Sequence, residues 1–242
     1  MGNRDELGSR MKLQYENAYR IMLPRRCYVL CRVDGRAFHS YTRGCQKPFD
    51  YQLMDDIDAT ALYLCANVQN VAFSYQQSDE ISLLLTDFAL PTTDQFFGGN
   101  LQKMVSVTTS MATAMFTQLR PDGKMAQFDC RYWTMADPVE VGNYFVWRQK
   151  DWERNSVSMV AAQYASHKQL DGKTIADRHE IIHANGDNWT NYPAEAKNGR
   201  CIVKRGGKWT RETPPIFTQD WNYLYSLVPE ISQLPKEVGN GC

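Results

Sequence analysis

Residues 27–35 read Cys27-Tyr28-Val29-Leu30-Cys31-Arg32-Val33-Asp34-Gly35, an apolar run that ends on a carboxylate followed by a glycine. A short apolar run bounded by a turn residue is typical of a buried strand. The pattern therefore predicts a strand over residues 27–34 that ends at Asp34, followed by a loop over residues 35–48.

A second set of carboxylates lies in Gln76-Gln77-Ser78-Asp79-Glu80, where Ser78-Asp79-Glu80 predicts the tight turn of a hairpin. Hydrophobic periodicity predicts the elements on either side, in order strand 27–34, helix 50–68, strand 71–77, strand 81–86, helix 96–119 and strand 125–135. This order is the ferredoxin-like, α/β (α+β) pattern, in which the first strand lies beside the hairpin. We therefore expect Asp34, Asp79 and Glu80 to converge at one edge of the sheet.

The rest of the chain predicts helices and a hairpin around this unit. Helices are expected over residues 5–22, 138–167 and 177–185, a β-hairpin over 200–205 and 208–213, and an extended, proline-rich tail. We expect residues 1–138 to form the catalytic domain, and residues 139–242 to form a helical and hairpin extension packed on it as one structural unit.

Composition narrows the class of protein. The 242 residues carry no formal net charge, so contact with nucleic acid requires a local basic patch. The seven cysteines form no CxxC pair and predict reduced, buried thiols. No run approaches the ~20 apolar residues of a membrane span. We expect a cytoplasmic protein without membrane contact.

Asp34 and Asp79 are candidate Mg²⁺ ligands, because Mg²⁺ prefers hard oxygen donors and is often held by one or two carboxylates plus substrate phosphates. Gly35 is a candidate to add its backbone carbonyl, and Glu80 is the weaker third carboxylate. Two such ions can activate an attacking hydroxyl and stabilise a leaving pyrophosphate. The alternative is that these carboxylates only cap the backbone of local turns.

Basic residues predict phosphate contacts. Five of them are expected near the carboxylates: Arg32, Arg36, His39, Lys47 and Lys103. The segment from Lys197 to Arg211 has six basic residues and no acidic one, which predicts either a basic ribbon for a phosphate backbone or a merely soluble hairpin. His179-Glu180-Ile181-Ile182-His183 matches a zinc-protease motif, but no histidine follows it as a third ligand, so a chance match is favoured.

The chain resembles the tRNA-histidine guanylyltransferase family, including its Thg1-like members. The resemblance rests on these motifs: Arg32 to His39, Lys47-Pro48-Phe49-Asp50, Ser78-Asp79-Glu80, Gln102-Lys103, Phe128-Asp129-Cys130-Arg131, Trp147 to Asp151, Arg154-Asn155-Ser156 and Ser166-His167-Lys168. It implies a polymerase-like palm that adds GTP or other nucleoside triphosphates to the 5′ end of tRNA in the 3′→5′ direction, after ATP-dependent activation or on an existing 5′-triphosphate. It also implies a homotetramer.

The resemblance assigns roles to individual residues. Asp34, the Gly35 carbonyl and Asp79 would hold two Mg²⁺ ions, with Glu80 in catalytic support. The nucleotide-binding residues would be Arg32, Asp34, Gly35, Arg36, Ala37, Phe38, His39, Lys47, Ser78, Asp79 and Lys103. Arg154 and Asn155 are also candidate contacts for the tRNA end and acceptor stem, and the charge of the basic hairpin adds Lys204, Arg205 and Lys208 as candidates.

Two departures from the family pattern bear on the substrate. Eukaryotic members carry His-Ile-Asn-Asn where this chain has Glu153-Arg154-Asn155-Ser156, which favours templated 5′-end repair over addition of one G to tRNA-histidine. Asn100 also stands where many members have a basic residue. Two alternatives remain open: a palm-type nucleotide cyclase or signalling nucleotidyltransferase, and an inactive RNA-binding module.

Overall fold

A single antiparallel sheet organises the protein. The structure is a computed structural model that describes residues 6–90 and 92–230. The six strands are β1 (Tyr28–Gly35), β2 (Val71–Gln77), β3 (Glu80–Thr86), β4 (Phe128–Met135), β5 (Arg200–Arg205) and β6 (Lys208–Glu212). They lie side by side in the order β4-β1-β3-β2-β5-β6, and every neighbouring pair is antiparallel. The first four strands thus form the predicted ferredoxin-like sheet, and the predicted hairpin extends it beyond β2.

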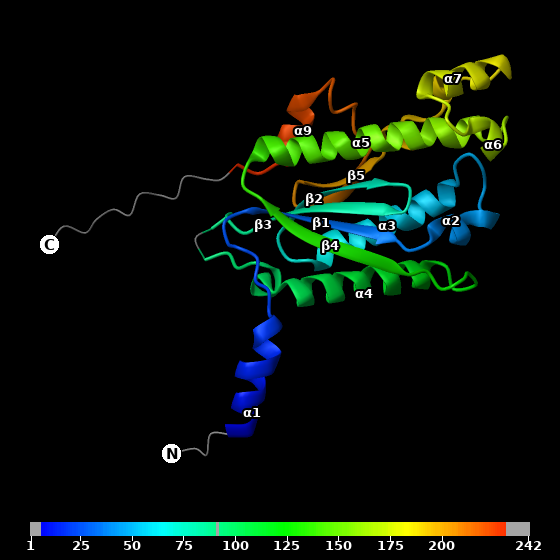
Figure 1. Cartoon of the computed structure of the whole chain (residues 1–242). Helices are drawn as coiled ribbons and strands as arrows, with labels where there is room; N and C mark the ends of the chain where they lie inside the picture. Colours follow the sequence, from blue (N-terminus) through cyan, green and yellow to red (C-terminus); the bar gives the residue numbers. More distant parts are fainter. Residues whose placement is uncertain (1–5, 91, 231–242) are drawn as a thin grey trace.

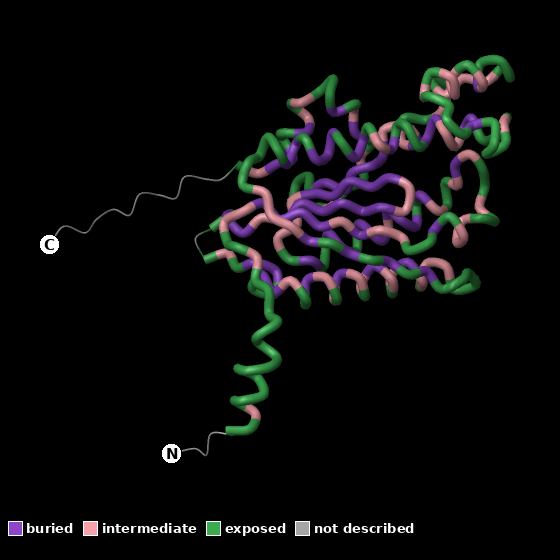
Figure 2. The backbone as a smooth tube through the Cα atoms, viewed as in Figure 1, coloured by how far each residue is buried: buried purple, intermediate pink, exposed green. Residues whose placement is uncertain are grey.

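Helices cover both faces of this sheet (Figure 1). One face packs on α3 (Tyr51–Asn67) and α4 (Leu101–Leu119), and the other packs on α5 (Pro138–Ala161) and α9 (Trp221–Leu227). Figure 2 shows that the strands between these layers are mostly buried. Alternate residues of each strand point to opposite faces, so β1 supplies both cores while Arg32 and Asp34 lie on the α5 face.

Polar caps determine where the long helices begin. The side chains of Asp50, Asn100 and Asp137 accept hydrogen bonds from the first turns of α3, α4 and α5. The shorter helices are α1 (Glu6–Met11), α2 (Phe38–Tyr41), α6 (His167–Leu170), α7 (Ile175–Ala184) and α8 (Ala194–Asn198). Short 3₁₀ or π segments span Lys12–Glu16, Asn17–Tyr19, Thr42–Gly44, Phe96–Gly99 and Trp189–Asn191.

Several sequence expectations need correction. The expected loop over 35–48 contains α2, and α4 begins at Leu101 because a 3₁₀ turn precedes its asparagine cap. Helix α5 ends at Ala161, before residue 167. The tail forms α9, whose first turn is capped by Asp220. The end of the tail, residues 231–242, lies outside the described residues.

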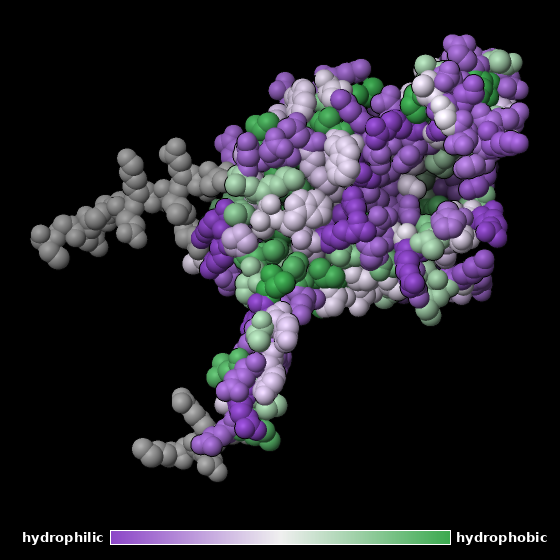
Figure 3. Space-filling view, in the orientation of Figure 1, coloured by the Kyte–Doolittle hydropathy of each residue, from purple (hydrophilic) through white to green (hydrophobic). Residues whose placement is uncertain are grey.

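The N-terminal segment projects from the body as an arm (Figure 1). Its regular α-helix stops at Met11, earlier than the predicted residue 22, and continues as π and 3₁₀ turns. The predicted apolar positions Leu7, Met11 and Tyr15 are 59%, 41% and 60% exposed, so none of them is buried by the described part of the chain. Figure 3 shows hydrophobic side chains on the arm and at its junction with the body.

Among the described residues, no helix combines the length and the apolar character needed to cross a bilayer.

Candidate active site

Asp79 lies directly against the end of β1. The turn Ser78-Asp79 joins β2 to β3, and the Gly35 amide donates to the Asp79 carbonyl at 3.2 Å. A methyl group added to Gly35 would lie 2.7 Å from Asp79 Oδ2 and 2.3 Å from Phe38 Cδ2. These approaches leave no room for a larger side chain, so glycine is what allows the Asp79 carboxylate to rest on the backbone beside Asp34.

The electrostatics of Asp79 fit a cation site. Burial raises the pKa of Asp79 to about 6, and the charges of Asp34 and Glu80 add to this rise. Among residues 6–90 and 92–230, no basic side chain forms an ion pair with Asp34 or Asp79. Two carboxylates without a counter-ion, next to the backbone oxygen of Gly35, are a donor set that suits Mg²⁺.

Glu80 is held by an arginine from α5. It lies opposite Asp34 in the β1–β3 register, but Arg148 donates to both of its carboxylate oxygens, at 2.7 and 2.6 Å. Both side chains are buried, and Arg32 approaches Glu80 at 4.0 Å. In the described part of the chain, no group of three or more His, Cys, Asp or Glu side chains is placed to hold a metal. The expected convergence of the three carboxylates at one edge of the sheet is confirmed. The metal role of Asp34 and Asp79 and the supporting role of Glu80 stay predictions.

The loop after β1 brings the other expected nucleotide residues to the same end of the sheet. His39 and Lys47 are exposed, and Arg36 donates to Gln127 at 2.8 Å. Ala37 and Ser78 have left-handed backbones, with φ of 54° and 49°.

The Phe38 ring is buried and packs on three rings, those of Tyr41, Phe116 and Phe128. Phe38 is therefore a core residue whose ring has no free face for a base.

Lys103 lies at the opposite end of the molecule within one chain. It belongs to the first turn of α4, beside Arg20 and the base of the arm. The other end of α4 reaches the site, because Phe116 packs on Phe38. Phe116 follows Lys103 by thirteen positions along the helix, a rise of about 20 Å. The expectation that Lys103 lies near the carboxylates is wrong for this chain taken alone.

Three arginines of the basic hairpin pair with acidic side chains. Arg200 is fully buried and pairs with Asp58 at 2.9 Å. Arg211 pairs with three acidic side chains, those of Asp55, Asp58 and Glu195, and Arg205 pairs with Glu212. Lys204 lies over the Trp209 ring at 5.6 Å, and Lys208 is exposed. Free basic charge on this ribbon is therefore concentrated at Lys204 and Lys208.

Two further sequence features are placed by the helices of the second half. Arg154 and Asn155 are exposed on α5, and Arg154 pairs with Asp151 at 2.7 Å. His179 and His183 stack on α7 with ring centroids 6.3 Å apart, and no metal-binding group of the described residues includes them. A chance match on a surface helix stays the favoured interpretation of the zinc-protease motif.

Sequence reasoning gave no role to three residues that border the site. Arg148 holds Glu80, and Asp129 and Arg131 on β4 lie directly opposite Asp34 and Arg32. The alternation of buried Phe128, Cys130 and Tyr132 with polar neighbours was the signal that Asp129 and Arg131 share the other face of β4.

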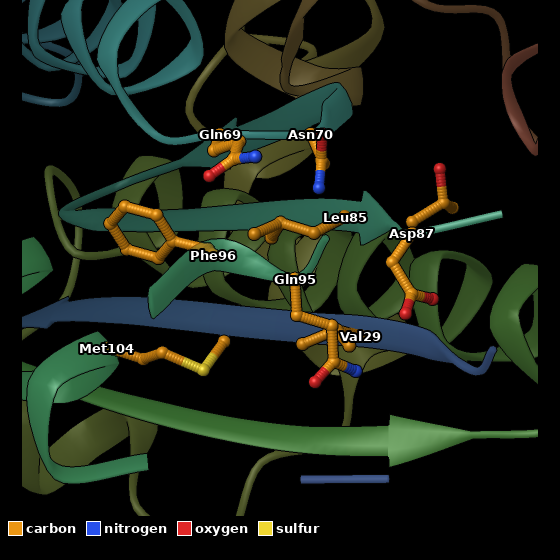
Figure 4. A pocket seen from close by; sticks show the side chains of 9 residues that line it. Val29, Gln69, Asn70, Leu85, Asp87, Gln95, Phe96 and Met104 are labelled. Carbon is orange, nitrogen blue, oxygen red and sulfur yellow. The ribbon is translucent and has the colours of Figure 1, made fainter. Parts of the chain in front are cut away.

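A small pocket at the far end of the strands is not a nucleotide site. It lies between β1, β3 and the 3₁₀ turn before α4, where Val29, Leu85 and Met104 line it (Figure 4). Its volume of about 10 Å³ is room for no more than one water molecule.

The chain is similar in sequence to proteins of a known family. A family model described as tRNAHis guanylyltransferase (Thg1) matches residues 8–136. The tRNA(His) guanylyltransferase of Schizosaccharomyces pombe is 26% identical over 86% of this chain and 81% of its own length.

Solved structures with the same description are also similar to this protein. A bacterial tRNA(HIS) guanylyltransferase (Thg1)-like protein in complex with ATP is 42% identical, with a TM-score of 0.87 over 92% of this chain and 99% of that one. Its complex with GTP is 41% identical, with a TM-score of 0.79 over 93% of this chain and 99% of that one. The enzyme of Saccharomyces cerevisiae, at 20% identity, shares the fold, with a TM-score of 0.69 over 86% of this chain and 99% of that one.

Proposed function

Because this chain belongs to the tRNAHis guanylyltransferase (Thg1) family of nucleotidyltransferases, we propose that it adds nucleotides to the 5′ end of tRNA in the 3′→5′ direction. The observation that carries this proposal is the carboxylate pair Asp34 and Asp79 around Gly35, held at the end of β1 without a counter-ion. ATP and GTP are proposed as substrates, since the bacterial relative has been solved with each of them.

Asp34, Asp79 and the Gly35 carbonyl would hold Mg²⁺, with two ions proposed by resemblance to the family. When bound, Mg²⁺ would offset negative charge on the phosphates and lower the pKa of the attacking hydroxyl. Arg148 fixes Glu80, and Gly35 keeps the Asp79 carboxylate close to the backbone. Arg36, His39, Lys47 and Ser78 border the same end of the sheet, where they would bind the incoming triphosphate.

In the proposed reaction, the 3′-hydroxyl of an incoming nucleoside triphosphate attacks the α-phosphorus of an activated RNA 5′ end. The new phosphorus–oxygen bond forms as the bond to the leaving group breaks. The hydroxyl loses its proton, and pyrophosphate leaves a 5′-triphosphorylated end or AMP leaves an adenylylated one. The incoming nucleotide keeps its own triphosphate, so the product is again activated.

Templated repair is the favoured form of this activity. The chain has Glu153-Arg154-Asn155-Ser156 where eukaryotic members have His-Ile-Asn-Asn, and its identity is 42% with the bacterial Thg1-like protein against 26% with the S. pombe enzyme. Arg154, Asn155, Lys204, Arg205 and Lys208 are proposed tRNA contacts. A cytoplasmic homotetramer, with a palm over residues 1–138 and an extension over 139–242, completes the proposal.

The test is 5′ extension of a triphosphorylated tRNA that lacks its first nucleotide, with Mg²⁺ and labelled triphosphates. Asp79→Asn should abolish extension, and Asp122→Asn, which changes an exposed turn carboxylate, should not. Growth by template-matched nucleotides would support repair, and one G added only to tRNA-histidine would support the narrower activity. Consumption of triphosphate without RNA growth would contradict the proposal and favour a cyclase.

A further inference from the structure

A chain of ion pairs leads from the acidic edge of the sheet to the outer surface of α5. Glu80 lies opposite Asp34, and the Nε and Nη2 atoms of Arg148 donate to its two oxygens at 2.7 and 2.6 Å. The same Nη2 lies 3.1 Å from Asp151 Oδ2, and Asp151 Oδ1 accepts from Arg154 at 2.7 Å. Charges of opposite sign alternate along this ion-pair chain, so the hold of each group on one neighbour depends on its other neighbour.

Exposure to solvent rises along the ion-pair chain. The side chains of Arg148, Asp151 and Arg154 are 7%, 28% and 58% exposed. The outer guanidinium is therefore open to an RNA phosphate, whereas the inner ion pairs are shielded and are screened least by salt. A phosphate that binds Arg154 takes away one partner of Asp151, and leaves the Asp151 carboxylate to Arg148 alone.

Glu80 has a second cation within reach. The Nε of Arg32 lies 4.0 Å from Glu80 Oε2, and is buried without a hydrogen-bond partner among the described residues. Because Arg148 Nη2 is shared between Glu80 and Asp151, a stronger pull by Asp151 weakens its hydrogen bond to Glu80. The Glu80 carboxylate can then turn to Arg32, two residues before Asp34 on β1. Two alternative partners for one carboxylate are the kind of two-state element through which one site acts on another.

We infer that Asp151 is a positioning residue that couples RNA binding at Arg154 to the position of Glu80. In the structure, which holds no RNA, Arg148 holds Glu80. With a phosphate on Arg154, Asp151 draws Arg148 outward and Glu80 passes to Arg32. The carboxylate beside the candidate metal site thus changes place when RNA binds, which would restrict turnover of triphosphates to the RNA complex. The inference rests on the proposed function, since it takes Arg154 as an RNA contact.

Equilibrium binding of RNA in excess chelator tests this coupling without metal or turnover. The probe is a labelled acceptor-stem RNA hairpin with a 5′-phosphate. Coupling between sites is reciprocal, so Glu80→Gln, which leaves Arg148 to Asp151 and thereby frees Arg154, should tighten binding about 5-fold, the low end for coupled sites. The matched control is the same substitution in an Asp151→Asn background, where it should have no effect. That background keeps any long-range effect of the lost charge and removes only the coupling.

Equal tightening in both backgrounds, or none in either, would overturn the inference. So would a wild-type protein that does not bind the hairpin. Extension of tRNA without the expected binding pattern would refute the coupling alone, and the expected pattern without extension would refute only the proposed activity.

Steady-state extension separates coupling from a merely structural role. Asp151→Asn should lower kcat without raising the KM for RNA, because Arg154 loses only its acidic partner and stays free to bind phosphate. A higher KM with unchanged kcat would show that Asp151 only holds Arg154 for RNA, and would overturn the inference.

Trp147 provides a readout that leaves the buried ion pairs intact, and it decides the question if Glu80→Gln does not fold. The Cζ atom of Arg148 lies 4.5 Å from the Trp147 ring centroid, so a movement of Arg148 changes the surroundings of this ring. In protein labelled with 5-fluorotryptophan, the ¹⁹F resonance that is lost in Trp147→Phe should shift when the hairpin is added to the wild type. It should not shift in Asp151→Asn, although RNA still binds. A shift that persists in this variant would show direct contact of RNA with Trp147 and would overturn the inference.

Discussion

Replacing Asp79 with asparagine should stabilise the metal-free protein and abolish nucleotide transfer. Burial and two neighbouring carboxylates raise the pKa of Asp79 from 3.8 to about 6, so the folded protein binds this proton more tightly than the unfolded chain. The stabilisation from protonation is fully present below the unfolded pKa and is lost as pH rises through the folded value. A shift of about two units corresponds to about 3 kcal/mol of unfavourable charge burial at neutral pH.

Urea denaturation with excess chelator, at about pH 8 and about pH 4.5, measures this cost. The advantage of Asp79→Asn over the wild type should be about 2 kcal/mol larger at the higher pH, because most of the charge is removed by protonation at the lower pH. Added Mg²⁺ should then stabilise the wild type but not the variant, since only the wild type gains binding energy in the folded state. A difference between the two proteins that is independent of pH would refute the reasoning.

Three other substitutions test the surroundings of this carboxylate. Gly35→Ala forces apart Phe38 and Asp79, and should lower extension activity about 100-fold in single-turnover assays; unchanged activity would contradict the close approach. Arg148→Met leaves the buried Glu80 with only the more distant Arg32, at 4.0 Å, as a cationic partner, and should cost about 3–5 kcal/mol in urea denaturation, with partial recovery when Glu80→Leu is added. Asp58→Ala leaves Arg200 without its counter-ion and should cost a similar ~3–5 kcal/mol; a loss below ~1 kcal/mol would show that the pair is solvated.

The strand order was predictable because each strand carries its own local signal. The apolar run 27–34, the turn Ser78-Asp79 and the hairpin around Gly206-Gly207 all depend on neighbouring residues, and the structure confirms each strand. The meeting of Asp34 and Asp79 then follows from topology, because the ferredoxin-like order places β1 beside the hairpin.

The ion pairs were not predictable, because their partners are distant in sequence. Arg148 holds Glu80 across 68 positions, and Arg200 holds Asp58 across 142. A basic segment without internal acids therefore looked free, although acids of α3 and α8 pair with Arg200 and Arg211. Lys103 was misplaced for a different reason: membership of a motif says nothing about which end of a helix faces the site.

The seating of the C-terminal hairpin on β2 has a consequence for the order of events on the ribosome. The strands β1 to β4 are all synthesised by residue 135, but β2 keeps an unpaired edge, and Asp58 lacks Arg200, until residue 200 emerges. At about 5–20 residues per second, this interval lasts about 3–13 seconds. During it the nascent chain presents an apolar, unprotected strand edge that a chaperone can bind and a neighbouring nascent chain can pair with. Slow translation across α5 to α8 would lengthen that exposure, so codon choice in this stretch should influence the yield of folded protein.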